Sequence, residues 1–180
     1  MGRMISPEAL RRFPLFAGVE GGLLRMLSAT AQRMHSPANE TLYHEGDHAH
    51  SFYILLRGEI ELRIAMGGKC LAHFGLSSLG MNDILGWAAL IEPYEYPTSA
   101  FCLDACELIA FDSLKLSELI GHQPQLGHML MNRLLAIVSG RLTYMHIRMA
   151  SLIEGDAWQE LAGRTPAYLS DGGRLHPIDR

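Results

Sequence analysis

The sequence predicts a mainly β domain of barrel or jelly-roll type with helices at both ends. Between residue 36 and about residue 112, short β-favouring runs alternate with glycine turns, which is typical of a rolled antiparallel sheet rather than of β–α–β units. Before and after this region, apolar residues recur at steps of three and four, which indicates helices. The 180 residues, 48% hydrophobic and 19% charged, suit one packed domain with a modest extension, or at most two very small ones.

Two helical stretches are expected at the N-terminal end. Ser6 can cap the first helix, with Pro7 in its first turn. Residues 20–32 form the second, because their leucines share one helical face, and Pro14 and Gly18 break the chain between the two.

The β region contains five strand candidates separated by turn signals. They span residues 42–44, 51–56, 59–66, 69–74 and 101–111. The pair Gly67-Gly68 predicts a type I′ hairpin, and Gly46 and Gly58 mark further tight turns. Asn39 is expected to adopt a left-handed conformation at a turn.

The C-terminal part is helical again. A short helix runs from a cap at Asp112 or Ser113 to about Ile120, where Gly121 can end it. A long helix follows over residues 125–153. Its apolar stripe comprises Leu126, Met129, Leu130, Leu134, Ile137, Val138, Leu142, Met145, Met149 and Leu152.

The long helix would be about 42 Å long, more than a small barrel is wide. Its far end therefore needs another apolar surface, either the same helix of a second subunit or its own barrel, and we expect a homodimer. The predicted domain is residues 6–153, with the roll at 36–112, the dimerisation helix at 124–153 and an irregular tail at 154–180.

Composition excludes several classes of function. A net charge of −4 without any basic block argues against nucleic-acid binding, and so do the few basic residues after residue 153. The three cysteines lack metal or disulfide spacing, and no signal peptide or bilayer-length apolar run is present, so we expect a cytoplasmic protein away from membranes. The motifs of nucleophilic catalysis, dinucleotide binding and P-loops are absent, so no catalytic residues and no enzyme are expected.

Three stretches resemble cyclic nucleotide-binding domains. Residues 42–47 (Leu-Tyr-His-Glu-Gly-Asp) and 51–62, which include Tyr-Ile-Leu and Gly-Glu, resemble the family's opening strands. Residues 83–90 (Asp-Ile-Leu-Gly-Trp-Ala-Ala-Leu) resemble the start of its phosphate-binding cassette. The resemblance covers roughly residues 8–153. It implies an eight-stranded jelly roll, a short cassette helix and the long helix through which catabolite activator-like members dimerise.

The resemblance also implies an atypical ligand site. Gly86 and Thr98 match the family, but Trp87 stands where a glutamate accepts the ribose hydroxyl and Pro97 where an arginine neutralises the phosphate. Tryptophan only donates and proline carries no charge, so neither residue can make that contact. The implied ligand-binding residues are Gly86, Trp87, Ala88, Ala89, Thr98, Ser99 and Tyr144.

The resemblance therefore implies a regulatory sensor domain without a DNA-binding domain. Its ligand would be a cyclic nucleotide (cAMP or cGMP) held weakly, or another small ligand. Trp87 either stacks on this ligand or fills the core. Thr143, Tyr144 or His146 of the long helix could reach the ligand; the alternative is a dimer seam in which Tyr144 and Met145 pack against the partner.

Two other classes of function stay open. The domain could be a ligand-free dimerisation or protein-interaction module with a partner protein. A cupin-like metal enzyme is the third class, because His44, His48 and His50 cluster near acidic residues. Apolar Ile54 and Leu55 occupy the place of the expected glutamate ligand, so we expect exposed turn histidines and no metal.

Overall fold

The computed structural model describes residues 5–66 and 72–153, and its β region is a jelly roll of two four-stranded antiparallel sheets. The strand orders are β1-β8-β3-β6 and β2-β7-β4-β5. The strands are β1 (Ala31–Ser36), β2 (Thr41–Tyr43), β3 (Ser51–Arg57), β4 (Ile60–Met66), β5 (Ala72–Leu79), β6 (Ile84–Leu85), β7 (Ser99–Cys102) and β8 (Cys106–Asp112). The predicted mainly β jelly roll with flanking helices is confirmed.

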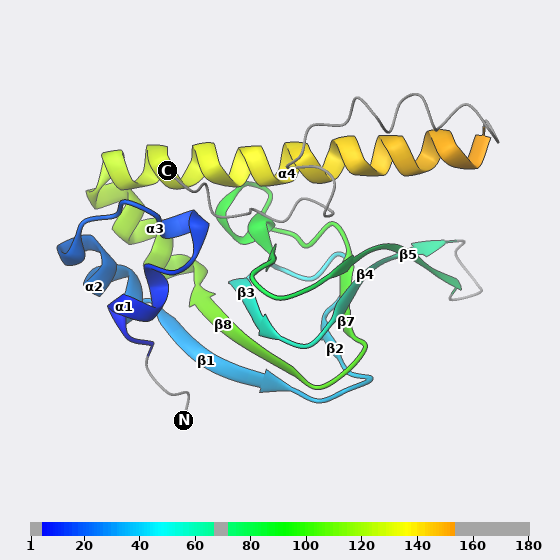
Figure 1. Ribbon diagram of the computed structural model, residues 1–180, viewed down its shortest axis with the longest axis horizontal. Coiled ribbons are helices and arrows are strands. Elements are labelled where there is room, and N and C mark those ends of the chain that lie inside the picture. Colours follow the sequence, from blue (N-terminus) through cyan, green and yellow to red (C-terminus); the bar gives the residue numbers. More distant parts are fainter. Residues whose placement is uncertain (1–4, 67–71, 154–180) are drawn as a thin grey trace.

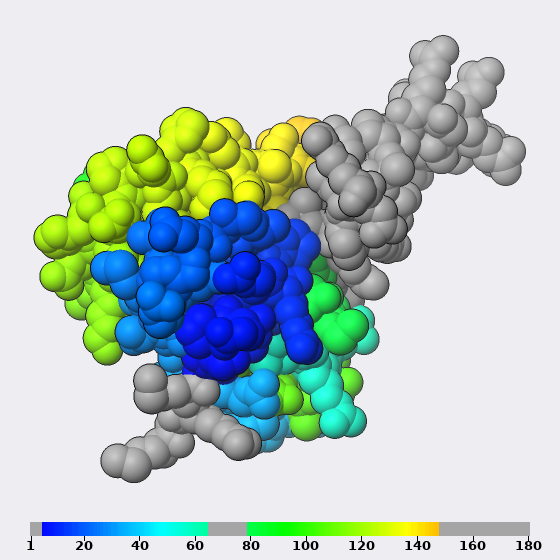
Figure 2. All heavy atoms as spheres, turned by 60° about the vertical axis from the view of Figure 1, so that its left-hand side comes forward, coloured from blue at the N-terminus to red at the C-terminus, as the bar shows by residue number. Residues whose placement is uncertain are grey.

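Helices cover one end and one side of the roll (Figure 1). They are α1 (Pro7–Leu10), η1 (Pro14–Phe16), α2 (Gly21–Ala29), η2 (Trp87–Leu90), α3 (Ser113–His122) and α4 (Pro124–Ile153). In Figure 2 the N-terminal helices, in blue, lie directly against α3 and α4, in yellow-green. Arg133 of α4 fixes this contact by donating to the Leu15 carbonyl at 2.8 Å. Among the helices of the described residues, none is both long and apolar enough to cross a membrane.

The core between roll and helices is built on β3 and β8, which pair over most of their length. Phe111 of β8 contacts Phe52 of β3 and Phe16 of η1, with ring centroids 5.5 and 5.6 Å apart. All three phenylalanines are at most 1% exposed. Burial of such large side chains is the main stabilising contribution to a domain of this size.

Several local predictions are confirmed. The Ser6 side chain accepts the Ala9 N–H at the start of α1, and Asp112 accepts the Lys115 N–H at the start of α3. Asn39 has a φ of 64°, and Gly46 and Gly58 have φ values of 82° and 98°. Helix α3 runs through Gly121 and ends at His122, two residues beyond the expected end.

The predicted second helix is too long at its C-terminal end. The helix stops at Ala29, and Ala31 already begins β1, which pairs with β8 over its whole length. The Thr30 hydroxyl donates to the Leu27 carbonyl at the helix end. The helical spacing of apolar residues does not continue as a helix here, because residues 31–36 pair with β8, about 75 residues further along the chain. The roll therefore starts before residue 36.

The prediction of a single strand over residues 101–111 is wrong. This segment contains two strands, β7 and β8, which belong to different sheets. The turn between them is held by the Asp104 carboxylate, which accepts the Glu59 N–H at 2.7 Å. Cys102 and Cys106 are both buried, on either side of this turn. Strands β4 and β5 pair as the expected hairpin, but Gly67-Gly68 and the tail at 154–180 lie outside the described residues.

Helix α4 confirms the predicted long helix, but its apolar residues form two faces rather than one stripe. Leu126, Leu130, Leu134 and Ile137 are at most 5% exposed and contact the rest of the domain. Leu135 and Leu142 lie on another face and are 67% and 53% exposed. One side of α4 is thus covered by the roll and the N-terminal helices, while the other carries unpartnered leucines among the described residues.

Candidate functional site

The cassette begins where β6 ends, at Gly86. This glycine has a φ of 72° and caps η2. A Cβ atom at this position would lie 2.7 Å from the Ser51 carbonyl oxygen, so only glycine fits the turn. The Ala89 N–H donates to the Gly86 carbonyl at 3.0 Å, which closes the short turn of η2.

The cassette loop after η2 is hydrogen-bonded to the turn between β2 and β3. The Tyr96 N–H donates to the Asp47 carbonyl, and the Gly46 N–H donates to the Tyr96 carbonyl, both at 2.9 Å. The Ser99 hydroxyl accepts the Glu45 N–H at 2.9 Å. Of the predicted ligand residues, Ser99 therefore already has a structural hydrogen bond.

Three tyrosines gather in the roll beside Gly86. Tyr43 stacks on Tyr96 with ring centroids 3.8 Å apart, and the ring centroids of Tyr43 and Tyr53 are 6.0 Å apart. All three are at most 8% exposed. The Tyr96 hydroxyl donates to the Ser51 carbonyl at 2.8 Å, which orients the stack.

Arg141 of α4 is a charged residue that the sequence analysis did not select. Its Nη2 atom lies 3.8 Å from Oδ1 of Asp83, whose side chain is only 5% exposed. The Nε and Nη2 atoms of Arg141 are buried and have no hydrogen-bond partner among the described residues. Burial lowers the pKa of Arg141, and the Asp83 carboxylate opposes this shift.

One signal in the sequence could have revealed Arg141. It continues the buried face of α4, since Leu134, Ile137 and Arg141 follow one another at steps of three and four. A cation at such a position is rare unless it has a partner or a function.

Burial, Arg141 and Gly86 together influence the ionisation of Tyr43. The charge of Arg141 and the backbone of Gly86 both favour ionisation of the phenol. Burial is the larger effect and raises the pKa of Tyr43 well above its usual value. The phenol is therefore neutral at physiological pH.

The other cassette residues predicted to bind a ligand differ in their burial, and two of them line a groove. Trp87 and Ala88 line a groove of about 420 Å³ beside the tyrosine stack, together with Glu45, Gly46, Ile91, Glu92, Pro93, Glu95, Tyr96 and Pro97. Trp87 is half-buried. It packs against the core and also lines this groove, so it is neither a fully buried core residue nor a fully exposed one. Thr98 is half-buried, and Ala89 is 1% exposed.

The α4 candidates also differ in exposure. Tyr144 is half-buried and lies three residues after Arg141, on the same side of the helix. Thr143 and His146 are exposed, and the Thr143 hydroxyl donates to the Ser139 carbonyl at 3.0 Å. Only Tyr144 of these three thus extends from the face that carries Arg141.

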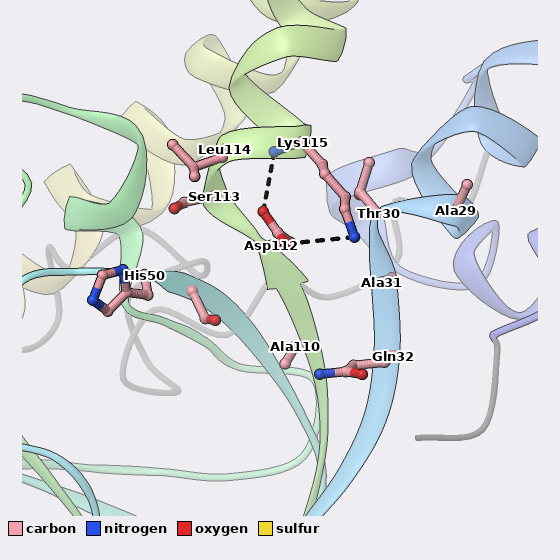
Figure 3. A pocket seen from close by; sticks show the side chains of 11 residues that line it. Ala29, Thr30, Ala31, Gln32, His50, Ala110, Asp112, Ser113, Leu114 and Lys115 are labelled. Carbon is pink, nitrogen blue, oxygen red and sulfur yellow. Dashed lines mark hydrogen bonds and ion pairs between the residues drawn. The ribbon is translucent and has the colours of Figure 1, made fainter. Parts of the chain in front are cut away.

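A second, polar pocket of about 320 Å³ lies at the start of α3 (Figure 3). Asp112 caps this helix and forms an ion pair with Lys115 at 3.6 Å. His50 lines the pocket, and its ring lies 4.6 Å from that of His48. Within residues 5–66 and 72–153, no three histidine, cysteine or acidic side chains are placed to hold a metal ion. None of the predicted ligand residues lines this pocket.

Comparison with known proteins decides the family. The model of the cyclic nucleotide-binding domain matches residues 33–123, just over half of the chain. The chain belongs to this family. This cyclic nucleotide-binding domain is 25% identical, over 83% of its length, to a CRP-like cAMP-activated global transcriptional regulator of Mycobacterium tuberculosis. It spans 64% of that regulator, so slightly less than two thirds of the relative's length.

Solved structures show the same fold. A putative cyclic nucleotide-binding protein from Geobacter metallireducens has a TM-score of 0.64 at 27% identity, with 72% of this chain and 92% of that one covered. A cyclic nucleotide-binding domain from Methylobacillus flagellatus has a TM-score of 0.69 at 21% identity, with 83% of both chains covered. The resemblance seen in the cassette and opening strands is thereby confirmed.

Proposed function

We propose that this cyclic nucleotide-binding domain is a non-enzymatic regulatory sensor, which takes a small anionic ligand between the cassette and α4. The observation that carries the proposal is the buried guanidinium of Arg141, with two nitrogen atoms that lack hydrogen-bond partners among the described residues. A buried donor without an acceptor is costly, and an anionic oxygen would satisfy it.

The candidate ligands are cAMP and cGMP. Gly86, Trp87, Ala88, Ala89, Thr98, Ser99 and Tyr144 remain the predicted contacts, and Arg141 adds the positive charge that Pro97 cannot supply. Trp87 leaves the ribose contact unreplaced. A charge-assisted hydrogen bond contributes about 1.5–3 kcal/mol, so we expect affinity about 10- to 150-fold below that of a site with both charged contacts.

Calorimetric titration with cAMP and cGMP tests this proposal. We expect Arg141→Gln to remove the binding seen with the wild-type protein, and Arg141→Lys to retain part of it. Arg25→Gln changes an exposed arginine of α2 and serves as the matched control. Equal binding by the wild-type protein and Arg141→Gln, with circular dichroism showing both folded, would refute the role of Arg141.

We also propose that the domain forms a homodimer through the second face of α4. Met131, Leu135, Val138, Leu142 and Met145 follow one another at steps of four and three, the spacing of a coiled-coil seam. Leu135 and Leu142 are the exposed members of this series. A second copy of the same helix offers the matching seam, and the roll occupies the opposite side.

The oligomeric state checks the dimer. We expect the double substitution of Leu135 and Leu142 by Glu to yield a monomer in analytical ultracentrifugation. Leu114→Glu alters a leucine of α3 that is 79% exposed and lies outside the seam, so this control should remain dimeric. A wild-type protein that is monomeric at 100 μM concentration would contradict the proposal.

A ligand-free interaction module is the second candidate function. The stack of Tyr43, Tyr53 and Tyr96 favours it, because these rings fill the roll beside Gly86. In a Trp158→Phe background, Trp87 is the remaining tryptophan of the sequence. Fluorescence that does not respond to cAMP, cGMP or inorganic phosphate would favour this second function.

A further inference from the structure

The groove beside the cassette loop is charged with one sign only. Its volume is about 420 Å³, within the range of roughly 300–1,000 Å³ that is typical of ligand pockets. Three exposed glutamates line it, Glu45, Glu92 and Glu95, and no lysine, arginine or histidine of the described residues joins them. A phosphate would be repelled in this groove, whereas a cation would be attracted.

Most of the remaining surface of the groove is apolar. It is formed mainly by Trp87, Ile91, Pro93, Tyr96 and Pro97. The face of an indole ring attracts a cation, and arginine stacks on aromatic faces more often than lysine does. The groove thus combines an aromatic side chain with carboxylates, and a guanidinium group is complementary to both.

Backbone hydrogen bonds hold the walls of the groove in place. The Tyr94 N–H donates to the Ile91 carbonyl at 2.9 Å, and the Ala49 N–H donates to the Tyr94 carbonyl at 2.7 Å. Tyr96 uses both its N–H and its carbonyl to bind the turn between β2 and β3. A groove that is already ordered avoids part of the entropic cost of binding.

Exposed apolar side chains extend the surface of the groove outward. Ile91 is 47% exposed, and Tyr94, which lies between two lining residues, is 37% exposed. Neighbouring exposed apolar groups are typical of surfaces that bind other proteins. A peptide can cover these two side chains together with the groove, whereas a small amine fills the groove alone.

We propose that this groove is a docking site for an arginine-bearing peptide segment of a partner protein. The arginine side chain stacks on Trp87, and the carboxylates of Glu92 and Glu95 accept its N–H groups. This inference goes beyond the proposed sensor function and does not depend on Arg141. Glu92 and Glu95 are not among the predicted nucleotide contacts, so their substitution tests the groove alone.

The experiment titrates three probes into the protein by isothermal calorimetry. The probes are the capped peptides acetyl-Leu-Arg-Arg-Leu-amide and acetyl-Leu-Glu-Glu-Leu-amide, and the amine spermidine. We expect the arginine peptide to bind about tenfold or more tightly than either of the other two. In a Trp158→Phe background, where Trp87 is the remaining tryptophan, the arginine peptide should also change the fluorescence.

Variants of the groove test which side chains bind the peptide. Glu92→Gln combined with Glu95→Gln should weaken binding of the arginine peptide about 2- to 30-fold, and Trp87→Leu should weaken it about 2- to 5-fold. Glu8→Gln combined with Glu20→Gln makes the same change of charge at exposed glutamates of the N-terminal region. This matched control should bind the arginine peptide as the wild-type protein does.

The outcomes separate the docking site from the proposed function. Equal binding of the two peptides, or unchanged binding by the folded variant with Glu92→Gln and Glu95→Gln, would refute the docking site. Spermidine that binds as tightly as the arginine peptide would make the groove a site for small amines and would also refute peptide docking. The same double variant should bind cAMP as the wild-type protein does. Binding of the arginine peptide without any binding of cAMP would support the docking site and count only against the proposed function.

Discussion

Replacement of Gly86 by alanine tests the geometry of the cassette directly. The new Cβ atom would lie 2.7 Å from the Ser51 carbonyl oxygen, 3.1 Å from Cδ2 of Tyr53 and 3.2 Å from Cε1 of Tyr96. The Ser51 oxygen is backbone and the two rings are held in the tyrosine stack, so none of the three can yield cheaply. A φ of 72° adds the cost of a left-handed conformation.

The left-handed conformation and the steric overlap of the new Cβ atom each contribute to the loss of stability. A left-handed conformation costs an alanine about 1–2 kcal/mol, and overpacking costs about 1–3 kcal/mol. We therefore expect Gly86→Ala to lower the free energy of unfolding by about 2–5 kcal/mol. Urea denaturation followed by circular dichroism measures this quantity.

Gly18 provides the matched control. Its φ of 71° is nearly the same, and an added Cβ atom would meet nothing within 4 Å. Gly18→Ala should therefore lose only the conformational contribution of about 1–2 kcal/mol. Equal losses for Gly86→Ala and Gly18→Ala would show that the cassette does not press against Ser51 and the tyrosines, and our account of Gly86 would be wrong.

Two further predictions concern a helix cap and a buried thiol. Asp112→Ala should lower the free energy of unfolding by about 1 kcal/mol because α3 loses its cap. Lys115→Ala removes only the exposed ion pair and should lower this free energy by less. A larger loss for Lys115→Ala than for Asp112→Ala would contradict the role of Asp112 as a cap. Burial raises the pKa of the Cys106 thiol from 9.0 to about 12. Only the unfolded thiol ionises between these values, so stability should be unaffected below pH 9 and fall toward pH 12, with a flatter profile for Cys106→Ala in urea titrations at each pH.

The sequence predicts those parts of the fold that local chemistry controls. Ser6 and Asp112 cap helices because their side chains reach the first free N–H groups, and this depends on neighbours three residues away. Asn39, Gly46 and Gly58 take left-handed conformations for equally local reasons. The long helix α4 was predictable from its sustained apolar periodicity and the lack of internal proline.

The parts that were missed depend on contacts between distant segments. Strand β1 exists because β8 pairs with residues 31–36, and no local pattern encodes this partner. The split between β7 and β8 depends on Asp104, which holds the Glu59 N–H 45 residues away in sequence. The charge of the candidate site depends on how α4 docks, because only that docking brings Arg141 to Asp83.

The position of Arg141 next to Leu142 in the chain has a consequence for signalling. Successive residues of a helix point about 100° apart, so the Arg141 guanidinium faces Asp83 while the adjacent Leu142 faces outward. A turn of α4 by about 20° would carry side chains some 2 Å around its axis, given a helix radius of about 5 Å. If the proposed ligand binds Arg141 and the proposed dimer forms through Leu142, a ligand that turns α4 also shifts the contact with the second copy, and helix α4 itself then transmits ligand binding to the dimer interface.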